Sequence, residues 1–316
     1  MVFYILNRLL SAFPVLFGIS LVVFIIISLI PGDPATAILG SYATPDNVTI
    51  LNRQLGLDKP LWQRYFIWLL NILRGDFGVS FSLNRPVLEE VLERFNATLI
   101  LSGTALIICS TVGLLLGVIS AAKQYSGCDR LITLFVLIGI SIPSFFLGMI
   151  FILYFAVSLR WFPVSGMYSL YGGGGFKDLV LHLIMPAVTL SLVATGVIAR
   201  FTRSAMLEVL RLDYIRTARA KGVDERRVIW DHALRSAIVV VLPLLGLQAG
   251  FVLSGAVFIE IVFQWPGVGR MLVDAILTRD IMLVQGGVLF IAVCYVIFNL
   301  IVDIIQILLD PRILKQ

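Results

Sequence analysis

Residues Phe95–Ala122 read FNATLILSGTALIICSTVGLLLGVISAA, and this run of 28 residues contains no Asp, Glu, Lys or Arg. A bilayer core about 30 Å thick needs about 20 apolar residues in a helix, so the run is long enough to span it. Five further uncharged runs have lengths of 24, 29, 21, 24 and 22 residues: Leu9–Gly32, Leu131–Leu159, Leu179–Ala199, Ser236–Ile259 and Ile281–Val302. None shows the two-residue alternation that a transmembrane barrel requires. The sequence therefore predicts an all-α, polytopic membrane protein with six transmembrane helices.

The composition supports a bilayer as the main surroundings of the chain. Hydrophobic residues make up 59% and charged residues 14%, with a mean hydropathy of +1.00. Soluble domains carry about 25% charged residues, spread over every helix. The net charge of +5 is typical of membrane proteins with basic cytoplasmic loops, so we expect the lipid bilayer, and no nucleic acid, as a partner.

The distribution of Lys and Arg predicts the orientation. If the N-terminus is cytoplasmic, the inner segments hold 14 Lys and Arg residues and the two short outer loops hold 4. Positive charge favours the cytoplasmic side of short loops, so both termini are predicted to be cytoplasmic. The chain then divides into an N-terminal segment with the first span, a long extracytoplasmic connector, a transmembrane core that includes a cytoplasmic loop at 200–235, and a cytoplasmic tail. Their bounds are 1–32, 33–94, 95–308 and 309–316.

The outer connector has a pattern of its own. Trp62–Leu70 reads as an amphipathic, aromatic-rich helix suited to the lipid headgroup region, and a second helix is predicted to begin near Pro86. A passive spacer is one interpretation. The connector is too apolar for disorder, however, which favours a folded extracytoplasmic cap.

The inner connector, Arg200–Arg235, predicts a helix, a tight turn and a short helix. Ser204–Lys221 forms the first helix, Gly222 ends it in the left-handed conformation, and Asp224 caps the second. The positive-inside rule explains the nine basic residues of this connector, but it does not explain the predicted helix–turn–helix structure. A docking element for a cytoplasmic partner explains both.

Several segments of the chain resemble one family of membrane proteins. Asp213–Gly222 followed by His232–Ala237 resembles the cytoplasmic signature of ABC-importer permeases of the dipeptide/oligopeptide/nickel subclass. Further segments agree in order along the chain: Arg8–Leu10, Pro31–Ala35, Leu55–Leu61, Gly75–Ser80, Trp265–Arg270 and Asp310–Arg312. The general permease pattern begins with Glu-Ala-Ala, where this chain has Arg216-Thr217-Ala218. That departure is typical of the peptide subclass.

The resemblance implies a type I ABC-importer permease architecture in a bacterial or archaeal cell (inner) membrane. It implies a second homologous permease subunit, two cytoplasmic ATPase subunits that bind ATP and Mg²⁺, and an extracytoplasmic solute-binding protein as partners. The implied substrates are small peptides, with glutathione-like peptides or a nickel chelate as alternatives. The residues implied to couple the chain to the ATPases are Arg216, Thr217, Ala218, Arg219, Ala220, Lys221 and Gly222.

Catalytic motifs are missing from the sequence. It contains no Gly-x-x-x-x-Gly-Lys-Ser/Thr phosphate loop and no metalloprotease or nucleophile-elbow motif. His182 and His232 fall on opposite sides of the predicted membrane and cannot share a metal ion. We therefore expect no catalytic residue, no metal site, no cofactor bound by this chain and no enzyme activity.

A few polar and helix-breaking residues inside the spans are candidates for a substrate pathway. Pro143 and Pro186 interrupt apolar runs, as residues near a pathway often do. The polar candidates are Ser141, Ser144, Gln248 and Ser254. Such side chains line pathways, but they also hold transmembrane helices together, and the sequence leaves both interpretations open.

Two acids, Glu260 and Asp303, lie nearest the interiors of spans. A carboxylate in the bilayer costs about 2.5–3.5 kcal/mol on insertion scales, so each needs a partner, a gating or structural role, or a position that reaches the interface. A self-sufficient channel or secondary transporter remains an alternative function. It would need paired broken helices or a buried charged cluster, which the sequence does not show.

Overall fold

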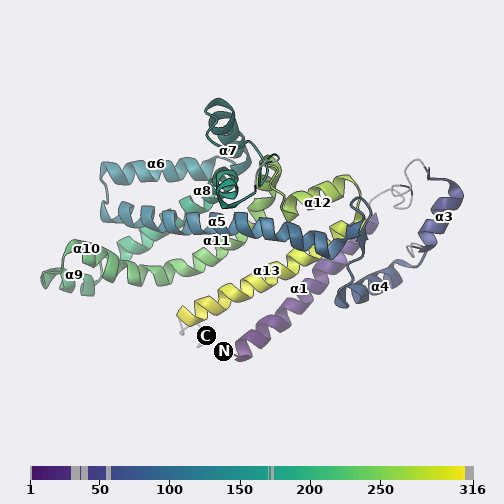
Figure 1. The fold of residues 1–316 in the computed structure, drawn as a ribbon. Coiled ribbons are helices and arrows are strands. Elements are labelled where there is room, and N and C mark those ends of the chain that lie inside the picture. Colours follow the sequence, from purple (N-terminus) through teal and green to yellow (C-terminus); the bar gives the residue numbers. More distant parts are fainter. Residues whose placement is uncertain are drawn as a thin grey trace. The chain divides into compact units, whose positions relative to one another are not determined.

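The computed structural model describes residues 2–29, 36, 42–54, 58–169, 171 and 174–309. Some of the sequence features above lie wholly or mainly outside these residues: Pro31–Ala35, Leu55–Leu57, and the tail with Asp310–Arg312. The described chain is almost entirely helical (Figure 1). The prediction of an all-α fold is therefore confirmed.

The chain separates into two compact units. The first comprises Met1–Asn96 and Met271–Ile301, and the second comprises Ala97–Arg270 and Val302–Gln316. The elements that begin in the first unit are α1 (Val2–Leu29), α3 (Pro45–Gln54), α4 (Leu61–Leu73), β1 (Val79–Ser80), β2 (Arg85–Pro86), α5 (Val87–Ala122) and α13 (Ile281–Leu309). The elements that begin in the second unit are α6 (Gly127–Ser141), α7 (Ser144–Phe151), η2 (Ile152–Ser158), α8 (Phe176–Val209), α9 (Asp213–Ala220), α10 (Glu225–Arg227), η3 (Val228–Ala233), α11 (Leu234–Val262) and α12 (Val268–Leu277).

Among the described residues, five helices are long and apolar enough to cross a membrane, and a bent helix pair can supply a sixth span. The five cover residues within α1, α5, α8, the continuous helix from α10 to α11, and α13. Their positions match five of the six uncharged runs in the sequence. The predicted polytopic architecture is therefore confirmed.

The predicted third span is not one straight helix. It is divided into α6 and a second helix formed by α7 and η2, and the chain bends by 103° between them (Figure 1). Ile142 is extended, with φ −89° and ψ 127°, because the ring of the following Pro143 disfavours helical geometry before it. By contrast, α8 continues through Pro186 from Phe176 to Val209.

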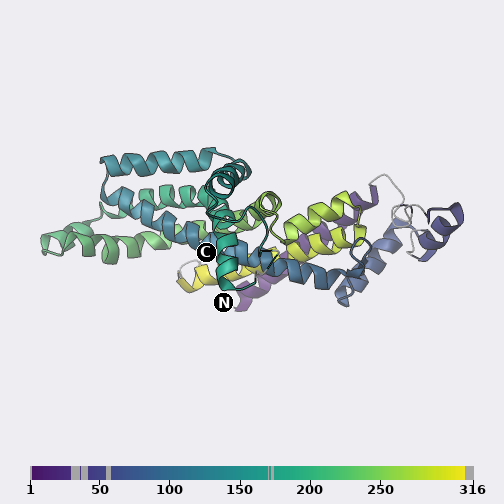
Figure 2. The same cartoon turned by 45° about the horizontal axis from the view of Figure 1, so that its top comes forward.

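Small residues allow close packing in the second unit. An ideal Cβ added to Gly117 of α5 would lie 2.7 Å from the carbonyl oxygen of Ala199 in α8, and one added to Gly113 would lie 3.1 Å from that of Thr195. Such small residues four apart permit the close helix contacts that are common in membranes. Helix α8 also packs against α6 and α11, and α6 runs beside α8 in Figure 1 and Figure 2. Helix α8 is thus central to this unit.

The helices at residues 200–235 differ from prediction in two ways. Ser204–Lys221 is not one helix, because α8 ends at Val209 and α9 begins at Asp213. The second helix is not short, because α10, η3 and α11 form one continuous helix from Glu225 to Val262. The π-helical stretch η3 lies at the beginning of this span.

Candidate functional site

Helix α9 is held against the second unit by one buried side chain. Ile215 is fully buried in an apolar cluster with Met206 of α8 and Val228 of η3. Tyr214 adds a hydrogen bond of 2.8 Å from its hydroxyl to Ser236 Oγ in α11. The rest of the helix is exposed except Ala218, which is half-buried against the same cluster.

The turn after α9 has the geometry expected from its glycine. Gly222 has φ +78°, a left-handed conformation that costs other residues about 1–2 kcal/mol. Its N–H donates to the carbonyl of Arg219 at 3.0 Å, and the N–H of Val223 donates to that of Ala218 at 3.2 Å. Asp224 then caps α10, since its side chain accepts a hydrogen bond from the N–H of Arg226 at 3.1 Å. The predicted left-handed turn and cap are both present.

An ion pair closes this turn. Arg219 donates from Nε and from one terminal nitrogen to the two carboxylate oxygens of Glu225, at 3.0 and 2.6 Å. These hydrogen bonds raise the pKa of the Arg219 guanidinium. Both side chains are about half exposed, so the pair orients the turn more than it stabilises the fold.

The candidate coupling residues lie together on α9 and its turn. Ala218 is half-buried, whereas Arg216, Thr217, Arg219, Ala220, Lys221 and Gly222 are exposed. They make one exposed surface that carries the basic side chains of Arg216, Arg219 and Lys221. An ideal Cβ on Gly222 would meet no atom within 4 Å, so the glycine is required by its backbone conformation and not by crowding.

An ion pair that sequence analysis missed joins a buried carboxylate to a partly exposed arginine in the second unit. Asp129 of α6 is 4% exposed and accepts two hydrogen bonds from Arg203 of α8, at 2.9 and 2.8 Å. Ser120 and the N–H of Tyr125 also donate to this carboxylate. Asp129 and Arg203 are 74 positions apart in sequence, so no local sequence pattern predicts their contact. It fixes the loop between α5 and α6 against α8.

The pathway candidates fall into two groups. Ser141, Pro143 and Ser144 lie at the break between α6 and α7, where the Ser141 hydroxyl donates to the carbonyl of Leu137 at 2.7 Å. Gln248 and Ser254 lie on α11, half-buried and exposed respectively. Ser254 donates to the carbonyl of Gly250 at 3.1 Å. Both serine hydroxyls are thus hydrogen-bonded within their own helices. These contacts do not distinguish a role in lining a substrate pathway from a role in helix packing.

The two acids differ in surroundings. Asp303 is half-buried in α13, whereas Glu260 of α11 is fully buried. The Glu260 carboxylate accepts hydrogen bonds from the Thr98 hydroxyl at 2.6 Å and from the N–H of Arg270 at 3.0 Å. The Glu260 carboxylate therefore joins α11 to α5 and to the first turn of α12. Sequence analysis did not identify Thr98 as its partner.

Close packing surrounds this carboxylate. An ideal Cβ on Gly267 would lie 2.1 Å from the Glu260 carboxylate, and the N–H of Val268 donates to Thr98 Oγ1 at 2.9 Å. The buried Trp265 donates from its indole nitrogen to the carbonyl of Ala97 at 2.8 Å. We call this arrangement of Ala97, Thr98, Glu260 and Trp265–Arg270 the Glu260 bracket.

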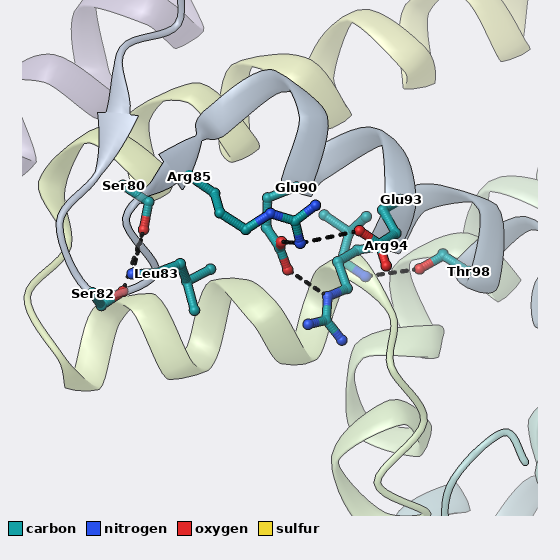
Figure 3. Close-up of polar contacts among 9 residues, drawn as sticks. Ser80, Ser82, Leu83, Arg85, Glu90, Glu93, Arg94 and Thr98 are labelled. Atoms are coloured by element: carbon teal, nitrogen blue, oxygen red, sulfur yellow. Dashed lines mark hydrogen bonds and ion pairs between the residues drawn. The ribbon is translucent and has the colours of Figure 1, made fainter.

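The first unit carries two polar clusters. Glu90, whose side chain is 2% exposed, accepts from Arg94 at 2.7 Å and from Arg85 at 2.9 Å (Figure 3). Asp280 is also buried and accepts from the hydroxyls of Ser80 and Ser82, at 2.6 and 2.8 Å. The two clusters attach the β1–β2 hairpin to the beginnings of α5 and α13. The connector residues in this part of the chain are therefore folded.

Metal-binding geometry is not found in the described ranges, where no group of three or more His, Cys, Asp or Glu side chains is placed to hold an ion. Together with the span pattern, the structure is that of a helical membrane protein.

Residues 113–315 match the family described as "Binding-protein-dependent transport system inner membrane component", and residues 1–102 match the description of its N-terminal part. The chain belongs to this family of ABC-importer permeases. It is a multi-pass inner-membrane protein that moves solute across the membrane and is not an enzyme. The predicted family and localisation are confirmed, and the alternative of a self-sufficient channel or secondary transporter is wrong.

Named relatives match over nearly their whole lengths. A di/tripeptide transport system permease of Pseudomonas aeruginosa is 44% identical over 100% of both chains. A dipeptide transport system permease of Escherichia coli K12 is 41% identical and a glutathione transport system permease of the same strain is 39% identical, each over 98% of both chains. The inward-facing methionine transporter MetNI has a chain with a TM-score of 0.57 and 18% identity, covering 71% of this chain and 97% of its own. That likeness confirms the permease fold.

Proposed function

We propose that this chain forms part of the translocation route of an importer for di- and tripeptides. The observation that carries the proposal is its 44% identity, over the full length of both chains, to a di/tripeptide permease. A relative that serves glutathione is 39% identical, and glutathione is itself a tripeptide. Glutathione-like peptides and a nickel chelate are the alternative substrates.

The working assembly contains four further subunits. They are a second, homologous permease, two ATPases that bind ATP and Mg²⁺, and an extracytoplasmic solute-binding protein. The exposed surface of α9 and Gly222 docks to an ATPase. Its exposed basic side chains suit an acidic groove, and Ala220 allows close approach of a partner. Within the connector at 33–94, the described elements α3, α4 and the β1–β2 hairpin form the folded extracytoplasmic cap.

The substrate route lies between the two permease subunits, because six spans are few to enclose a peptide-sized path alone. Ser141, Pro143, Ser144, Gln248 and Ser254 are the lining candidates. Their small and weakly polar surface suits peptides of varied sequence. Selection among substrates is left to the binding protein.

Uptake measurements test the substrate. The chain is produced with the proteins encoded beside its gene in a host that lacks its own peptide uptake. We expect saturable, ATP-dependent uptake of labelled di- and tripeptides, and competition by excess unlabelled dipeptide against every transported peptide. Preferential uptake of glutathione or of a nickel chelate, with no uptake of dipeptides, would replace the proposed substrate.

Reporter fusions test the orientation. An enzyme active only outside the cytoplasm is expected to be active when fused after Asp46 in the connector, and inactive when fused at Gly222 or after Gln316. The 14-to-4 distribution of Lys and Arg between the inner segments and short outer loops is the physical reason. A cytoplasmic reporter at the same three sites is the matched control and must give the opposite pattern. Activity of the outside reporter at Gly222 would reverse the orientation.

A further inference from the structure

Helix α4, which belongs to the extracytoplasmic connector, packs against the middle of the first span. The Tyr65 hydroxyl lies 2.8 Å from Ser20 Oγ of α1. Ser20 itself donates to the carbonyl of Phe17 at 2.8 Å, so Tyr65 is the donor in the contact between them. The Tyr65 ring meets the rings of Phe17 and Phe24 edge-on, with centroids 6.1 and 5.4 Å apart.

These contacts lie well below the outer end of the span. The candidate span covers Leu10–Leu29, and Ser20 precedes Leu29 by nine positions, which is about 13 Å along the helix axis. Trp68, one turn after Tyr65, meets Phe24 with ring centroids 5.8 Å apart. Phe24 precedes Leu29 by five positions, or about 7 Å. Both contacts therefore fall within the hydrophobic thickness of the first span.

The polar groups of this contact are satisfied without water. Ser20 is 1% exposed and Tyr65 is 4% exposed, and each hydroxyl takes part in a hydrogen bond inside the pair. A hydroxyl that is buried without a partner costs free energy. The contact is therefore suited to a site from which water is excluded.

The side of α4 turned away from α1 is apolar and uncovered. At 100° per residue, one broad arc of the helix carries five large apolar side chains, and all are exposed: Trp62, Phe66, Ile67, Leu70 and Leu73. Arg64 and Asn71 share a separate, narrow strip, and Gln63, which is half-buried, is the one polar side chain within the arc. An apolar surface of this size facing water is unfavourable and marks an interaction site.

The neighbouring surface of α1 indicates what covers this arc. Val22, Ile25 and Ile26 of α1 are also exposed, at the same level as the contact with α4. A transmembrane span presents such side chains to lipid. The two helices thus present apolar surface at one depth, and one occupant accounts for both.

We propose that α4 is immersed in the outer half of the bilayer and that its exposed apolar arc contacts lipid acyl chains. This differs from the headgroup location that the sequence predicts, because the contacts with Ser20 and Phe24 lie deeper than the headgroups. The connector then enters the membrane from outside at α4 and leaves it before the β1–β2 hairpin. The Tyr65–Ser20 hydrogen bond holds the helix against the span.

Spin-label accessibility tests the proposal in the complete transporter in liposomes. Cys109, Cys128 and Cys294 are first replaced by serine or alanine in a variant that retains transport. Single cysteines then replace Phe66 or Leu70 on the apolar arc and receive a nitroxide. Collisions with oxygen, which concentrates in lipid, and with chromium oxalate, which stays in water, are measured at each site.

Two reference positions calibrate the result, Ile25→Cys on the exposed apolar side of the first span and Asp46→Cys on the exposed helix α3. We expect Phe66→Cys and Leu70→Cys to show the oxygen-to-chromium ratio of Ile25→Cys. Ratios equal to that of Asp46→Cys would place the arc in water and overturn the proposal. Protection from both reagents would show a protein partner in place of lipid and would overturn it equally. Using two positions keeps the test decisive if one variant fails to assemble.

Discussion

The Gly222→Val variant is expected to insert into the membrane normally but to transport peptide at a rate at least about tenfold below that of the wild type. Gly222 has φ +78°, and a β-branched residue resists this conformation at a cost of at least about 1–2 kcal/mol. A change of 1.4 kcal/mol corresponds to about a tenfold change in rate. Relief of the strain would displace Arg219 and its ion pair with Glu225, and with them the surface proposed to dock the ATPase. Peptide uptake and ATP hydrolysis are measured on the same preparation.

The chain offers a matched control for this substitution. Gly75 also ends a helix, has φ +86° and has no atom within 4 Å of an ideal Cβ, yet it lies in the outer connector. Gly75→Val therefore carries a similar backbone cost, and we expect it to leave ATP hydrolysis coupled to uptake. Normal uptake by Gly222→Val with both ATPases bound would contradict the coupling role. Equal uncoupling by both variants would show a general loss of stability.

Alanine in place of Gly267 is expected to destabilise the folded protein by about 1–3 kcal/mol, the usual cost of overpacking. The added Cβ would lie 2.1 Å from the Glu260 carboxylate, so the carboxylate or the backbone must move. Either movement breaks hydrogen bonds to Thr98 or Arg270. Thermal unfolding of the purified transporter in detergent measures the effect. Gly255→Ala in α11 is the control, because its nearest contact is an ordinary 3.5 Å to Leu190.

A double-mutant cycle identifies the cause. Glu260→Ala alone leaves the Thr98 hydroxyl and the Arg270 N–H without their acceptor, at about 1–3 kcal/mol for each group. In that background Gly267→Ala is expected to cost little, because the colliding carboxylate is gone. Additive effects of the two substitutions would contradict the contact described for the Glu260 bracket.

The spans are predictable from sequence because the bilayer imposes length and lack of charge on them. What the two prolines do is not predictable in the same way. Pro143 and Pro186 both interrupt apolar runs, but only the first separates two helices. Helix α8 is buried over most of its length, and its packing holds it together around Pro186, whereas both helices beside Pro143 are largely exposed. Tertiary contacts, absent from a single sequence, decide between the two outcomes.

In the candidate coupling segment, α9 and its turn at Gly222, some features were also predictable from the sequence and others were not. The left-handed conformation of Gly222 and the cap at Asp224 follow from local residue chemistry, and both were predictable. The separation of α8 from α9 was not, because residues 210–212 contain neither glycine nor proline. Burial of Ile215 between α8 and η3 accompanies this separation. Pairs such as Asp129 with Arg203, or Glu260 with Thr98, lie 74 and 162 positions apart and become visible only in the fold.

The glycines of α5 have a mechanical consequence. Gly113 and Gly117 allow α8 to lie so close that Ala199 and Thr202 fill the space where a side chain would stand. A helix seated in this way cannot slide along its neighbour by a fraction of a turn without steric collision. We therefore expect α5 and α8 to tilt as one stiff lever during transport. Motion imposed at the C-terminal end of α8, beside α9, would then appear at the far end of the same pair of helices.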